Sequence, residues 1–496
     1  MESARLDIFT NLASQGAMIE RLSSDSRRCA PGVAFFAYPG ENADGRAYIA
    51  DAIGRGAAAV VWESADFAWR TEWNVPNVGV SGLKRRAGVF AHEFYGRPSE
   101  ALWVCGVTGT NGKTSTTQWI AALLGARGEK AGIIGTLGSG FPGALAAPVN
   151  TTPDALEIHG TLAALRGEGA RAVAMEVSSH GLAQGRVGGV AFDCALFTNL
   201  SHDHLDYHGT MEAYAEAKGM LFDTPGLESA VLNLDDVFGV QLARRLSARG
   251  VRTIGYALSP NAIAPGSVTE FVAAREIAFE KGAMRVALVT SWGEVETRIN
   301  QIGRFNVANA LGVLGCLLAH GVPFAEAAAL LGELPAVPGR MQRLAHPEGP
   351  LVVVDYAHTP DALEKVLQAL RPVADARGGA LVAVFGAGGD RDPAKRPVMG
   401  AIASRLADRV VLTSDNPRSE DPDAIIAAIR AGASGSTSVE PERAAAIERA
   451  VREAGAADVV LLAGKGHEPY QEIAGRRLPF SDAALAEAAL ARWRGR

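Results

Sequence analysis

The sequence predicts an α/β protein made of three domains with mostly parallel sheets. The chain has 496 residues, which is long for a single hydrophobic core. Short apolar runs alternate with longer segments of helical character, the order typical of strands joined by right-handed crossovers. Several runs end in glycine-rich or polar turns, and open α/β sheets bind ligands at such turns.

Residues 1–99 are expected to form a small N-terminal α/β domain. Strands are predicted over 33–38 and 57–62, with a helix from about Arg46 between them. This segment contains no phosphate-binding loop of its own.

Residues 100–337 are expected to form the central domain. The predicted elements are a strand from Leu102, a helix to about Arg127, a strand over 131–134, a helix after Thr152-Pro153, and a strand over 171–177. Thr152 is expected to be the N-cap of the second helix and Pro153 its first residue. Strands that alternate with helices predict a parallel sheet.

Residues 338–496 are expected to form a third α/β domain, which follows the proline-rich stretch 335–339. Its predicted strands are apolar runs that each end in a polar or glycine-rich turn, at 351–354, 381–385, 410–412 and 459–462.

The composition indicates a globular protein that acts on small molecules. Apolar residues make up 48% of the chain and charged residues 21%. A formal charge of −6 argues against a nucleic-acid-binding surface as the main role. The first residues of the sequence show no basic segment followed by an apolar run, and no stretch approaches membrane-spanning length, so we expect a cytoplasmic protein without membrane insertion.

The four cysteines are far apart in the sequence and form no Cys-x-x-Cys pair: Cys29, Cys105, Cys194 and Cys316. Neither a disulfide framework nor a thiolate zinc site is indicated. We expect reduced thiols within the core.

An apolar strand runs into a glycine-rich turn with Lys-Thr at a helix start, the pattern of a phosphate-binding loop (P-loop). The backbone N–H groups of such a loop point at phosphate oxygens, Lys113 can reach the β- and γ-phosphates, and Thr114 can ligate Mg²⁺. An ordinary glycine turn is the alternative, but the strand, glycines, Gly-Lys-Thr and helix occur together here. Val107 stands where the general pattern has glycine. The expected ATP-binding residues of the loop are Gly109, Thr110, Asn111, Gly112, Lys113, Thr114 and Ser115.

Two further groups of residues follow predicted strands and are candidates for metal binding. Residues 202–208 contain three histidines and two aspartates, and Glu176 ends another strand of the same sheet. Histidines suggest zinc, but the nearby triphosphate loop favours Mg²⁺, which prefers oxygen ligands. Glu176 could face the same Mg²⁺ as Thr114, although a glutamate in this position is often only solvated. His202 and His208 could instead make local hydrogen bonds.

Several motifs, in order, resemble those of the Mur ligase family over essentially the whole chain. They are the stretches 109–114, 175–180, 199–208, 214–218, 303–310, 355–360, 386–391, 415–418 and 464–468. The last three are similar to those of family members that add meso-diaminopimelate to UDP-N-acetylmuramoyl-L-alanyl-D-glutamate. Alternatives within the family are a lysine-adding ligase and a folylpolyglutamate synthetase-like ligase. Outside it, a switch GTPase would need Asn-Lys-x-Asp, which is absent, and a scaffold would not need Lys113, Glu176 and Lys218 together.

The resemblance implies a fold and an activity. The expected architecture is a small α/β domain for the UDP-sugar (1–99), a P-loop ATPase domain with a mostly parallel sheet (100–337) and a Rossmann-like domain for the amino acid (338–496). The expected activity is ATP-dependent amide ligation through an acyl phosphate. We expect the enzyme to bind Mg²⁺, as two ions, and to be a monomer.

The resemblance also implies site residues for each substrate. For ATP it adds Asn306, Asn309 and Asp355 to the loop. For the UDP-sugar peptide it implies Ser24, Ser26, Glu41, Asn42, Ala43, Asn150, Thr151, Thr152, Ser178, Gln184 and Arg186. For diaminopimelate it implies Arg391, Asp415, Asn416, Pro417, Arg418, Gly464 and Glu468.

The expected catalytic residues are Lys113, Glu176, His204 and Lys218, and the expected metal ligands are Thr114, Glu176, His204 and Lys218 as its carbamate. A plain ammonium beside two Mg²⁺ ions would repel them, whereas the carbamate that the family carries at the position of Lys218 is an anion. Arg418 is the cation suited to the carboxylate that lysine lacks and meso-diaminopimelate has.

Overall fold

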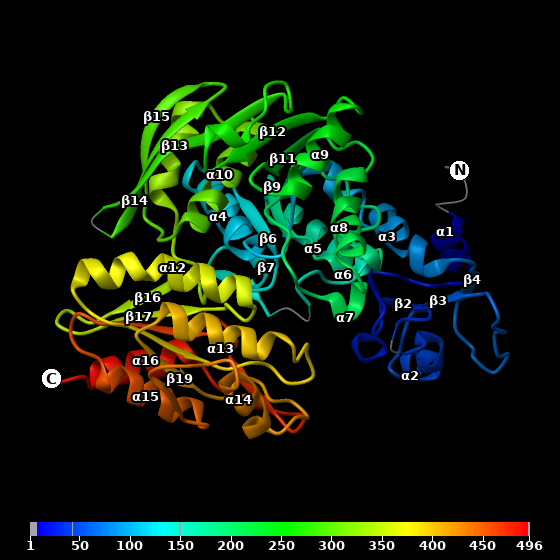
Figure 1. Cartoon of the computed structure of the whole chain (residues 1–496). Coiled ribbons are helices and arrows are strands. Elements are labelled where there is room, and N and C mark those ends of the chain that lie inside the picture. The colour runs from blue at the N-terminus through cyan, green and yellow to red at the C-terminus, as the bar shows by residue number, and fades with distance from the viewer. Residues whose placement is uncertain (1–6, 42, 148–149, 281, 495–496) are drawn as a thin grey trace.

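The computed structural model describes residues 7–41, 43–147, 150–280 and 282–494 and confirms the α/β fold class (Figure 1). Asn42, one of the expected site residues, lies outside the described residues. Three large sheets are each built from one stretch of chain, and a separate two-stranded hairpin follows the third. In Figure 1 the N-terminal part (blue) lies beside the central part (cyan to green), and the C-terminal part (yellow to red) lies below it.

The N-terminal sheet has four parallel strands in the order β1-β2-β3-β4. These strands are β1 (Arg21–Ser23), β2 (Val33–Ala37), β3 (Ala59–Glu63) and β4 (Asn77–Val80). The helices are α1 (Asp7–Ser14), α2 (Ile49–Gly54) and α3 (Leu83–Phe94), with short 3₁₀ turns at Ser26–Arg28, Gly45–Tyr48 and Pro98–Ala101. The helix expected from Arg46 therefore begins as a 3₁₀ turn, and α2 continues it.

The central sheet has eleven strands in the order β15-β14-β13-β12-β11-β10-β5-β9-β6-β7-β8. The parallel part consists of β5 (Trp103–Thr108), β6 (Ala131–Gly135), β9 (Ala172–Glu176), β10 (Cys194–Phe197), β11 (Ser229–Asn233), β12 (Arg252–Ala257) and β13 (Glu270–Glu280). Antiparallel strands extend both ends: β7 (Gly138–Phe141), β8 (Ala144–Ala146), β14 (Ala283–Thr290) and β15 (Gly293–Ile299). These antiparallel extensions were not predicted from the sequence.

Helices cover both faces of the central sheet and bury apolar side chains against it. One face packs against α4 (Lys113–Ala126) and α10 (Arg304–Ala319), and the other against α5 (Ala155–Gly167) and α9 (Val237–Ser247). The remaining helices of this part are α6 (Ser179–Ala183), α7 (Leu205–His208), α8 (Met211–Gly219) and α11 (Phe324–Leu330), with 3₁₀ turns at Met220–Asp223, Pro260–Ala262 and Leu331–Glu333.

The start of α5 corrects one prediction. Asp154, not Thr152, is the N-cap, because its carboxylate accepts hydrogen bonds from the N–H groups of Leu156 and Glu157. Thr152 is buried, and its hydroxyl donates to the backbone oxygen of Glu176 at 3.0 Å. Pro153 consequently precedes the helix.

The C-terminal sheet has six strands in the order β16-β17-β21-β18-β19-β20, and only β16 is antiparallel. These are β16 (Gln342–Ala345), β17 (Leu351–Asp355), β18 (Leu381–Phe385), β19 (Arg409–Leu412), β20 (Thr437–Val439) and β21 (Val459–Ala463). One face packs on α12 (Pro360–Arg377), α13 (Lys395–Leu406) and α14 (Pro422–Arg430), and the other on α15 (Arg443–Glu453) and α16 (Asp482–Ala491). The hairpin β22 (Tyr470–Ile473) and β23 (Arg476–Pro479) follows β21.

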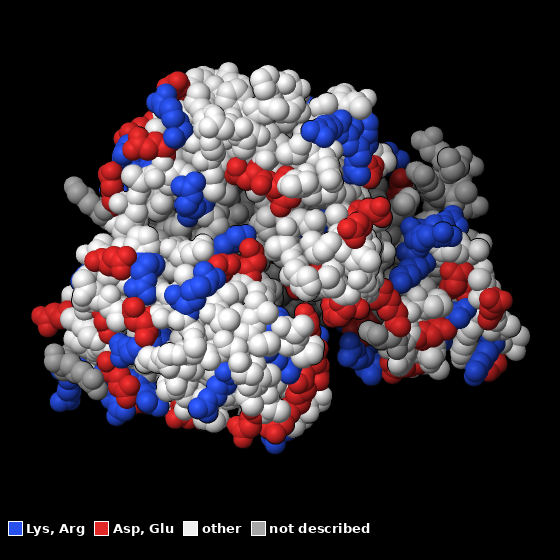
Figure 2. Space-filling model, in the orientation of Figure 1, with Lys and Arg blue, Asp and Glu red and all other residues white. Residues whose placement is uncertain are grey.

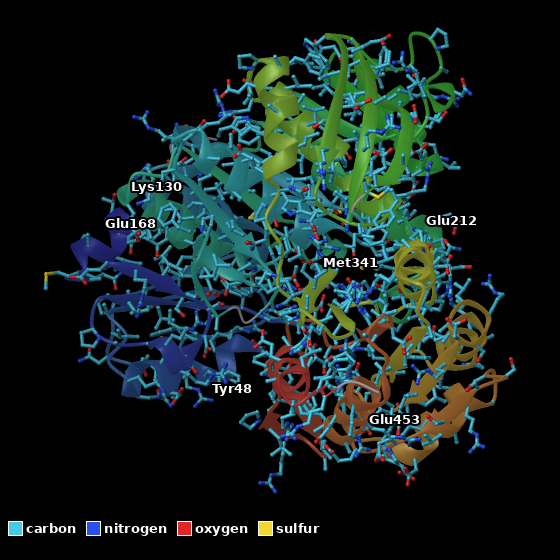
Figure 3. All side chains as sticks on the ribbon, turned by 90° about the vertical axis from the view of Figure 1, so that its left-hand side faces the viewer. Tyr48, Lys130, Glu168, Glu212, Met341 and Glu453 are labelled. Atoms are coloured by element: carbon cyan, nitrogen blue, oxygen red, sulfur yellow. The ribbon has the colours of Figure 1, made fainter. Side chains whose placement is uncertain are left out.

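The junction between the central and C-terminal parts carries Met341, which Figure 3 labels between them.

Lysine and arginine are interspersed with aspartate and glutamate over most of the face in Figure 2. Within the described residues, no helix has both the length and the apolar character needed to cross a membrane.

Candidate active site

A cavity of about 650 Å³ lies between the central and C-terminal parts, where Figure 2 shows the surface hollowed. The strands β5, β9 and β10 end at this cavity from the central sheet, and β17 ends there from the C-terminal sheet. Parallel strands present their carboxyl ends at one edge, so the following turns gather polar groups there. Its lining includes the expected residues Thr110, Asn111, Gly112, Lys113, Thr114, Ser115, Thr151, Glu176, Ser178, His204, Asn306, Asn309 and Asp355.

The glycine-rich loop packs tightly against the neighbouring strand end. Gly109 has a φ of +145°, and a Cβ there would collide with Thr198 Oγ1, so the position requires glycine. Lys113 folds back over the loop and donates to the backbone oxygens of Gly109 at 2.7 Å and Thr110 at 2.9 Å. Burial lowers the pKa of Lys113. Its ammonium therefore lies within the loop, where phosphate oxygens would compete for its hydrogen bonds.

Thr114 and Glu176 meet at the start of α4. The Thr114 hydroxyl donates to Glu176 Oε2 at 3.0 Å, and both residues are buried. Thr136 holds the same carboxylate through its N–H at 2.8 Å and its hydroxyl at 3.1 Å. Arg340 reaches in from the junction and donates to Thr114 Oγ1 at 3.2 Å while its guanidinium lies 4.3 Å from the Tyr356 ring centroid.

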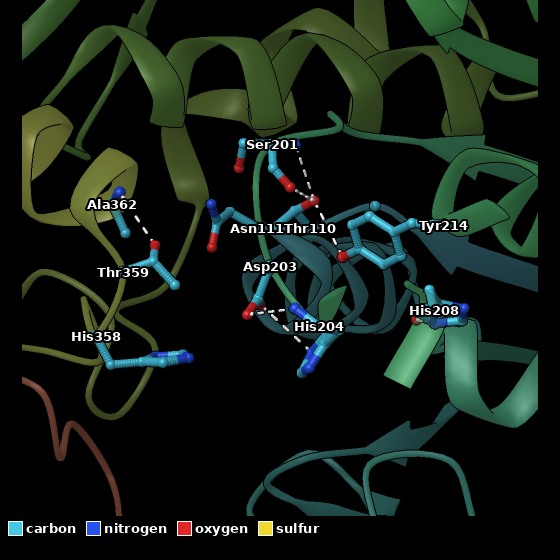
Figure 4. Close-up of polar contacts among 12 residues, drawn as sticks. Thr110, Asn111, Ser201, Asp203, His204, His208, Tyr214, His358, Thr359 and Ala362 are labelled. Carbon is cyan, nitrogen blue, oxygen red and sulfur yellow. Dashed lines mark hydrogen bonds and ion pairs between the residues drawn. The ribbon is translucent and has the colours of Figure 1, made fainter. Parts of the chain in front are cut away.

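Asp203 and His204 face the cavity from one side and His358 lies on the opposite side (Figure 4). His204 Nε2 lies 3.4 Å from Asp203 Oδ2. Desolvation raises the pKa of Asp203, but His204 and His358 outweigh it, and the net shift is downward. Desolvation lowers the pKa of His204 to about 4. A neutral imidazole beside a carboxylate can donate a lone pair to a cation.

The other two histidines of this motif lie in different surroundings. His202 is exposed. His208 Nε2 lies 3.0 Å from the Ser179 hydroxyl, so His208 makes a local hydrogen bond. His208 thus makes the kind of local hydrogen bond that was the alternative to metal binding.

Lys218 lies on α8, 1% exposed, directly beneath the phosphate loop. Its Nζ donates to the Gly109 backbone oxygen at 2.8 Å and lies 4.2 Å from the Tyr214 ring centroid. Burial, reinforced by the charge of Lys113, lowers the pKa of Lys218 well below its usual value. A lowered pKa increases the fraction of the amine that is uncharged and nucleophilic.

The three further residues expected at ATP are buried, and two of them, Asn306 and Asp355, form hydrogen bonds with the backbone. The Asn306 amide donates to the Ile302 backbone oxygen at 2.8 Å. Asn309 lies beside Gly112. The Asp355 carboxylate accepts from the N–H groups of Met341 at 2.7 Å and Ala357 at 2.8 Å, and burial raises its pKa. Asp355 therefore fixes the junction segment against the cavity.

Several of the residues expected at the UDP-sugar peptide lie along the contact between the N-terminal and central parts, whereas Asn150 and Thr151 lie on the side of the C-terminal part. Ser24 donates to Asp154 Oδ2 at 2.9 Å. The Glu41 carboxylate accepts from Gln184 at 2.7 Å and from the Tyr207 hydroxyl at 2.7 Å. The remaining members are placed as follows: Arg186 donates to the Thr152 backbone oxygen at 2.8 Å, Thr151 Oγ1 accepts from Thr136, Ser178 caps α6, Ser26 is buried, and Ala43 accepts from the Gly40 N–H.

A second cavity of about 930 Å³ adjoins the first and shares Thr136, Thr151 and Tyr356 with it. Asn150 and Thr151 line it from the central part, and Glu468 lines it from the C-terminal part. The structure thus brings residues expected at two different substrates to one space next to the phosphate loop.

The residues expected at diaminopimelate cluster at the carboxyl edge of the C-terminal sheet. The Asn416 amide donates to Glu468 Oε2 at 2.7 Å, and its oxygen accepts from Lys465 Nζ at 2.9 Å. Gly464 has a φ of +114°, and a Cβ there would collide with the Asp415 carboxylate. Pro417 is buried and Arg391 is exposed. Apart from Glu468, these residues do not line either cavity described above.

Arg418 is half-buried and has a left-handed backbone, with a φ of +52°. The hairpin holds it there, because Arg418 N–H donates to Glu472 O and Ala474 N–H donates to Arg418 O. Its Nη1 donates to the Gly389 backbone oxygen at 2.6 Å. Such strain persists only where the surroundings enforce it, and it is common at binding sites.

Two buried or partly buried cations near these sites, Lys465 and Arg340, were not predicted from the sequence. Lys465 is 0% exposed and pairs with Glu468 Oε2 at 3.1 Å as well as Asn416, and Arg340 contacts Thr114. Lys465 belongs to the stretch 464–468. A lysine between two glycines that follow an apolar strand could have identified it as a candidate binding residue. Arg340 had no local signal, because its contact depends on how two parts of the chain pack.

Models of three Mur ligase domains match the chain. The Mur ligase middle domain matches residues 107–317, the glutamate ligase domain of Mur ligases matches 339–466, and the catalytic domain of the Mur ligase family matches 18–95.

Curated relatives match nearly the full length. The UDP-N-acetylmuramoyl-L-alanyl-D-glutamate--2,6-diaminopimelate ligase of Chromobacterium violaceum is 50% identical, covering 97% of this chain and 96% of the relative. The protein of the same name from Pseudomonas aeruginosa is 52% identical and covers 97% of each. A solved structure of a ligase with that name is 35% identical, with a TM-score of 0.65, covering 96% of this chain and 95% of that one. The MurF ligase of Thermotoga maritima in complex with ADP, 18% identical, shares the fold with a TM-score of 0.67, covering 96% of this chain and 99% of that one.

Proposed function

This chain belongs to the Mur ligase family, and from that premise we propose that it joins meso-diaminopimelate to UDP-N-acetylmuramoyl-L-alanyl-D-glutamate at the expense of ATP. The reaction would supply a precursor of peptidoglycan. The observation that carries the proposal is the pair of adjoining cavities, one lined by the phosphate loop and the other by Asn150, Thr151 and Glu468. A ligase needs this arrangement because it must bring a phosphoryl donor, a carboxylate and an amine together.

The chemistry requires activation of the D-glutamyl γ-carboxylate, because an amine that attacks a free carboxylate would have to expel oxide. Transfer of the γ-phosphoryl group forms a P–O bond to the carboxylate and releases ADP. The amine of diaminopimelate then attacks the acyl carbon, loses a proton, and phosphate leaves. Lys113 would shift from the backbone oxygens of Gly109 and Thr110 to the phosphates and stabilise the transferring group.

The donor set at the cavity fits Mg²⁺. The Thr114 hydroxyl, the Glu176 carboxylate and His204 line it, and hard oxygen ligands predominate. Bound Mg²⁺ would neutralise charge on the triphosphate. Lys218 would act as its carbamate: the uncharged amine adds to CO₂, an N–C bond forms, and one proton is released. Its burial and depressed pKa support this reaction.

Substrate binding would be divided among the three proposed domains, 1–99, 100–337 and 338–496. The UDP-sugar peptide would lie along Ser24, Ser26, Glu41, Ala43, Asn150, Thr151, Thr152, Ser178, Gln184 and Arg186. Diaminopimelate would lie at Arg391, Asp415, Asn416, Pro417, Arg418, Gly464 and Glu468. Since most of the latter residues line neither cavity, we expect the C-terminal domain to close before chemistry. We expect the enzyme to act as a cytoplasmic monomer.

A lysine-adding or folylpolyglutamate synthetase-like ligase is the second candidate, because it would share the central motifs. The stretch Asp415 to Arg418 favours diaminopimelate, since Arg418 has N–H groups besides the one bonded to Gly389 with which to pair the second carboxylate.

The test is phosphate release from ATP with UDP-N-acetylmuramoyl-dipeptide and a panel of amino acids. We expect phosphate release only when both the UDP-N-acetylmuramoyl-dipeptide and an amino acid are present. Release should be much faster with meso-diaminopimelate than with lysine. Vigorous ATP hydrolysis with neither substrate would contradict ligation, and equal use of lysine would contradict the substrate assignment.

A further inference from the structure

Three of the four cysteines converge inside the central part, although they are far apart in the sequence. Cys105 lies on β5, Cys194 on β10 and Cys316 on α10, and all three are 0% exposed. Their Sγ atoms all lie within 4.8 Å of one another, and the Sγ atoms of Cys105 and Cys316 are 3.7 Å apart. Cys105 and Cys194 are direct partners in the parallel ladder, and α10 packs across this face of the sheet. We call these three residues the thiol cluster.

The spacing of the thiol cluster suits an element bound to three sulfur atoms. Bonds of about 2.3 Å to one central element separate the sulfurs by roughly 3.3 Å in a pyramidal arrangement and roughly 3.8 Å in a tetrahedral one. The Sγ atoms of Cys105 and Cys316, 3.7 Å apart, already match this spacing, and all three Sγ atoms lie within 4.8 Å of one another.

The surroundings of the thiol cluster are apolar. Its three members belong to one hydrophobic core with Val107, Leu196, Leu311 and other aliphatic side chains. Burial raises the pKa of the Cys316 thiol well above its usual value. An uncompensated charge in such a core is strongly disfavoured, so a ligand that leaves the cluster electrically neutral is preferred.

Divalent zinc fits this environment poorly, for two reasons. Structural zinc is almost always four-coordinate, and no fourth histidine, cysteine or carboxylate joins the cluster among the residues that the structure describes. Three thiolates around a divalent cation would also leave one net negative charge in the core. A trivalent element that takes three sulfurs avoids both penalties.

We propose that Cys105, Cys194 and Cys316 form a binding site for a trivalent thiophilic element, supplied as uncharged arsenous acid. Three S–H bonds and three As–O bonds break, three As–S bonds form, and three water molecules leave. No electron is transferred and the net charge does not change. The uncharged reactant and product both suit the apolar core.

Occupation would tie the phosphate-loop strand to α10. Cys105 stands on β5, which runs directly into the loop, and the same helix carries Asn309 beside Gly112. Because the thiols are fully buried, arsenic must enter when α10 transiently separates from the sheet, so we expect slow binding. Three bonds across the core would then stabilise the folded protein against heat.

The test is incubation of the full-length protein with arsenite, with a phosphine as the reductant because thiol reductants bind arsenic themselves. Native mass spectrometry should show one arsenic per chain with the loss of three protons, and the thermal unfolding midpoint should rise. Cys105→Ala, Cys194→Ala and Cys316→Ala should each reduce arsenic retention roughly tenfold or more. Cys29→Ala is the matched control, since Cys29 is also buried but lies in the N-terminal part.

Because three cysteine variants are tested, the experiment remains decisive if one substitution prevents folding. Circular dichroism shows which of the variants are folded. Arsenic retention that is unchanged in a folded cluster variant would overturn the proposal. So would a wild-type protein that takes up no arsenic after prolonged warming below its unfolding temperature, or one that retains zinc as strongly as arsenic.

Discussion

The Thr114 hydroxyl donates a 3.0 Å hydrogen bond to Glu176 Oε2 and so joins the first turn of α4 to the end of β9. Thr136 donates two more hydrogen bonds to the same carboxylate. The loop that would hold the phosphates and the carboxylate that would hold Mg²⁺ are therefore fixed relative to one another before any ligand binds. Phosphoryl-transfer enzymes owe most of their catalysis to such preorganised positioning and electrostatic stabilisation.

Glu176→Gln should lower kcat by about 10²–10³-fold and move the Mg²⁺ requirement to higher concentrations, because an amide is a weaker ligand than a carboxylate. The measurement is a Mg²⁺ titration of phosphate release. Glu63→Gln is the control, since Glu63 is also a buried carboxylate but accepts backbone hydrogen bonds in the N-terminal part. An unchanged Mg²⁺ titration in Glu176→Gln would remove Glu176 from the metal site.

Lys218→Ala should be folded but nearly inactive, and added acetate should partly restore turnover by replacing the lost carbamate. Wild-type activity should also fall reversibly when CO₂ is removed, because the carbamate is in equilibrium with CO₂. Phosphate release measures both effects. Lys130→Ala, which removes an exposed lysine on the surface in Figure 3, should behave as the wild type. Full activity of Lys218→Ala would exclude a catalytic carbamate.

Arg418→Ala should cost roughly 2–5 kcal/mol in kcat/KM for meso-diaminopimelate, the range for truncating one partner of a buried charge pair, and change lysine use much less. The native enzyme should prefer meso-diaminopimelate by about a hundredfold or more. Measuring both amino acids on both proteins isolates the contribution of the second carboxylate. Arg430→Ala, an exposed arginine of α14, is the control. Equal losses for both amino acids would make Arg418 a residue of the turn only.

His159 should make stability depend on pH. Burial lowers its pKa to about 4 from 6.5, and the side chain is 0% exposed. Between those pH values the unfolded chain binds a proton that the folded chain does not, so acidification should remove about 3 kcal/mol of stability. Thermal unfolding from pH 7 to 4 should show a loss about 3 kcal/mol smaller in His159→Gln than in the wild type and in His346→Gln, because His204, whose pKa is also lowered by burial, titrates in all three proteins. Identical slopes in all three proteins would contradict the assignment.

Local motifs predicted the elements that line the first cavity, because each motif depends on neighbouring residues. The phosphate loop joins β5 to α4 and Glu176 ends β9, as their short stretches predicted. The burial of Lys218 could not be read from its own helix, and the resemblance to Mur ligases pointed to it.

Contacts that depend on packing were missed. Arg340 meets Thr114 only because the two parts of the chain pack together, and the three cysteines converge only when β5, β10 and α10 assemble. Thr152 failed as a predicted N-cap because its hydroxyl bonds to the Glu176 backbone oxygen, which left the cap to Asp154. Local capping rules describe an isolated helix, and a tertiary hydrogen bond overrode them here.

The most direct test of the proposed reaction follows an oxygen atom. UDP-N-acetylmuramoyl-L-alanyl-D-glutamate labelled with ¹⁸O in the γ-carboxylate is incubated with ATP and either meso-diaminopimelate or lysine, and the phosphate and the peptide product are analysed by mass spectrometry. We predict one labelled oxygen in each phosphate released and a tripeptide that contains meso-diaminopimelate. Phosphate without label would contradict the acyl phosphate, and faster formation of the lysine product would contradict the substrate.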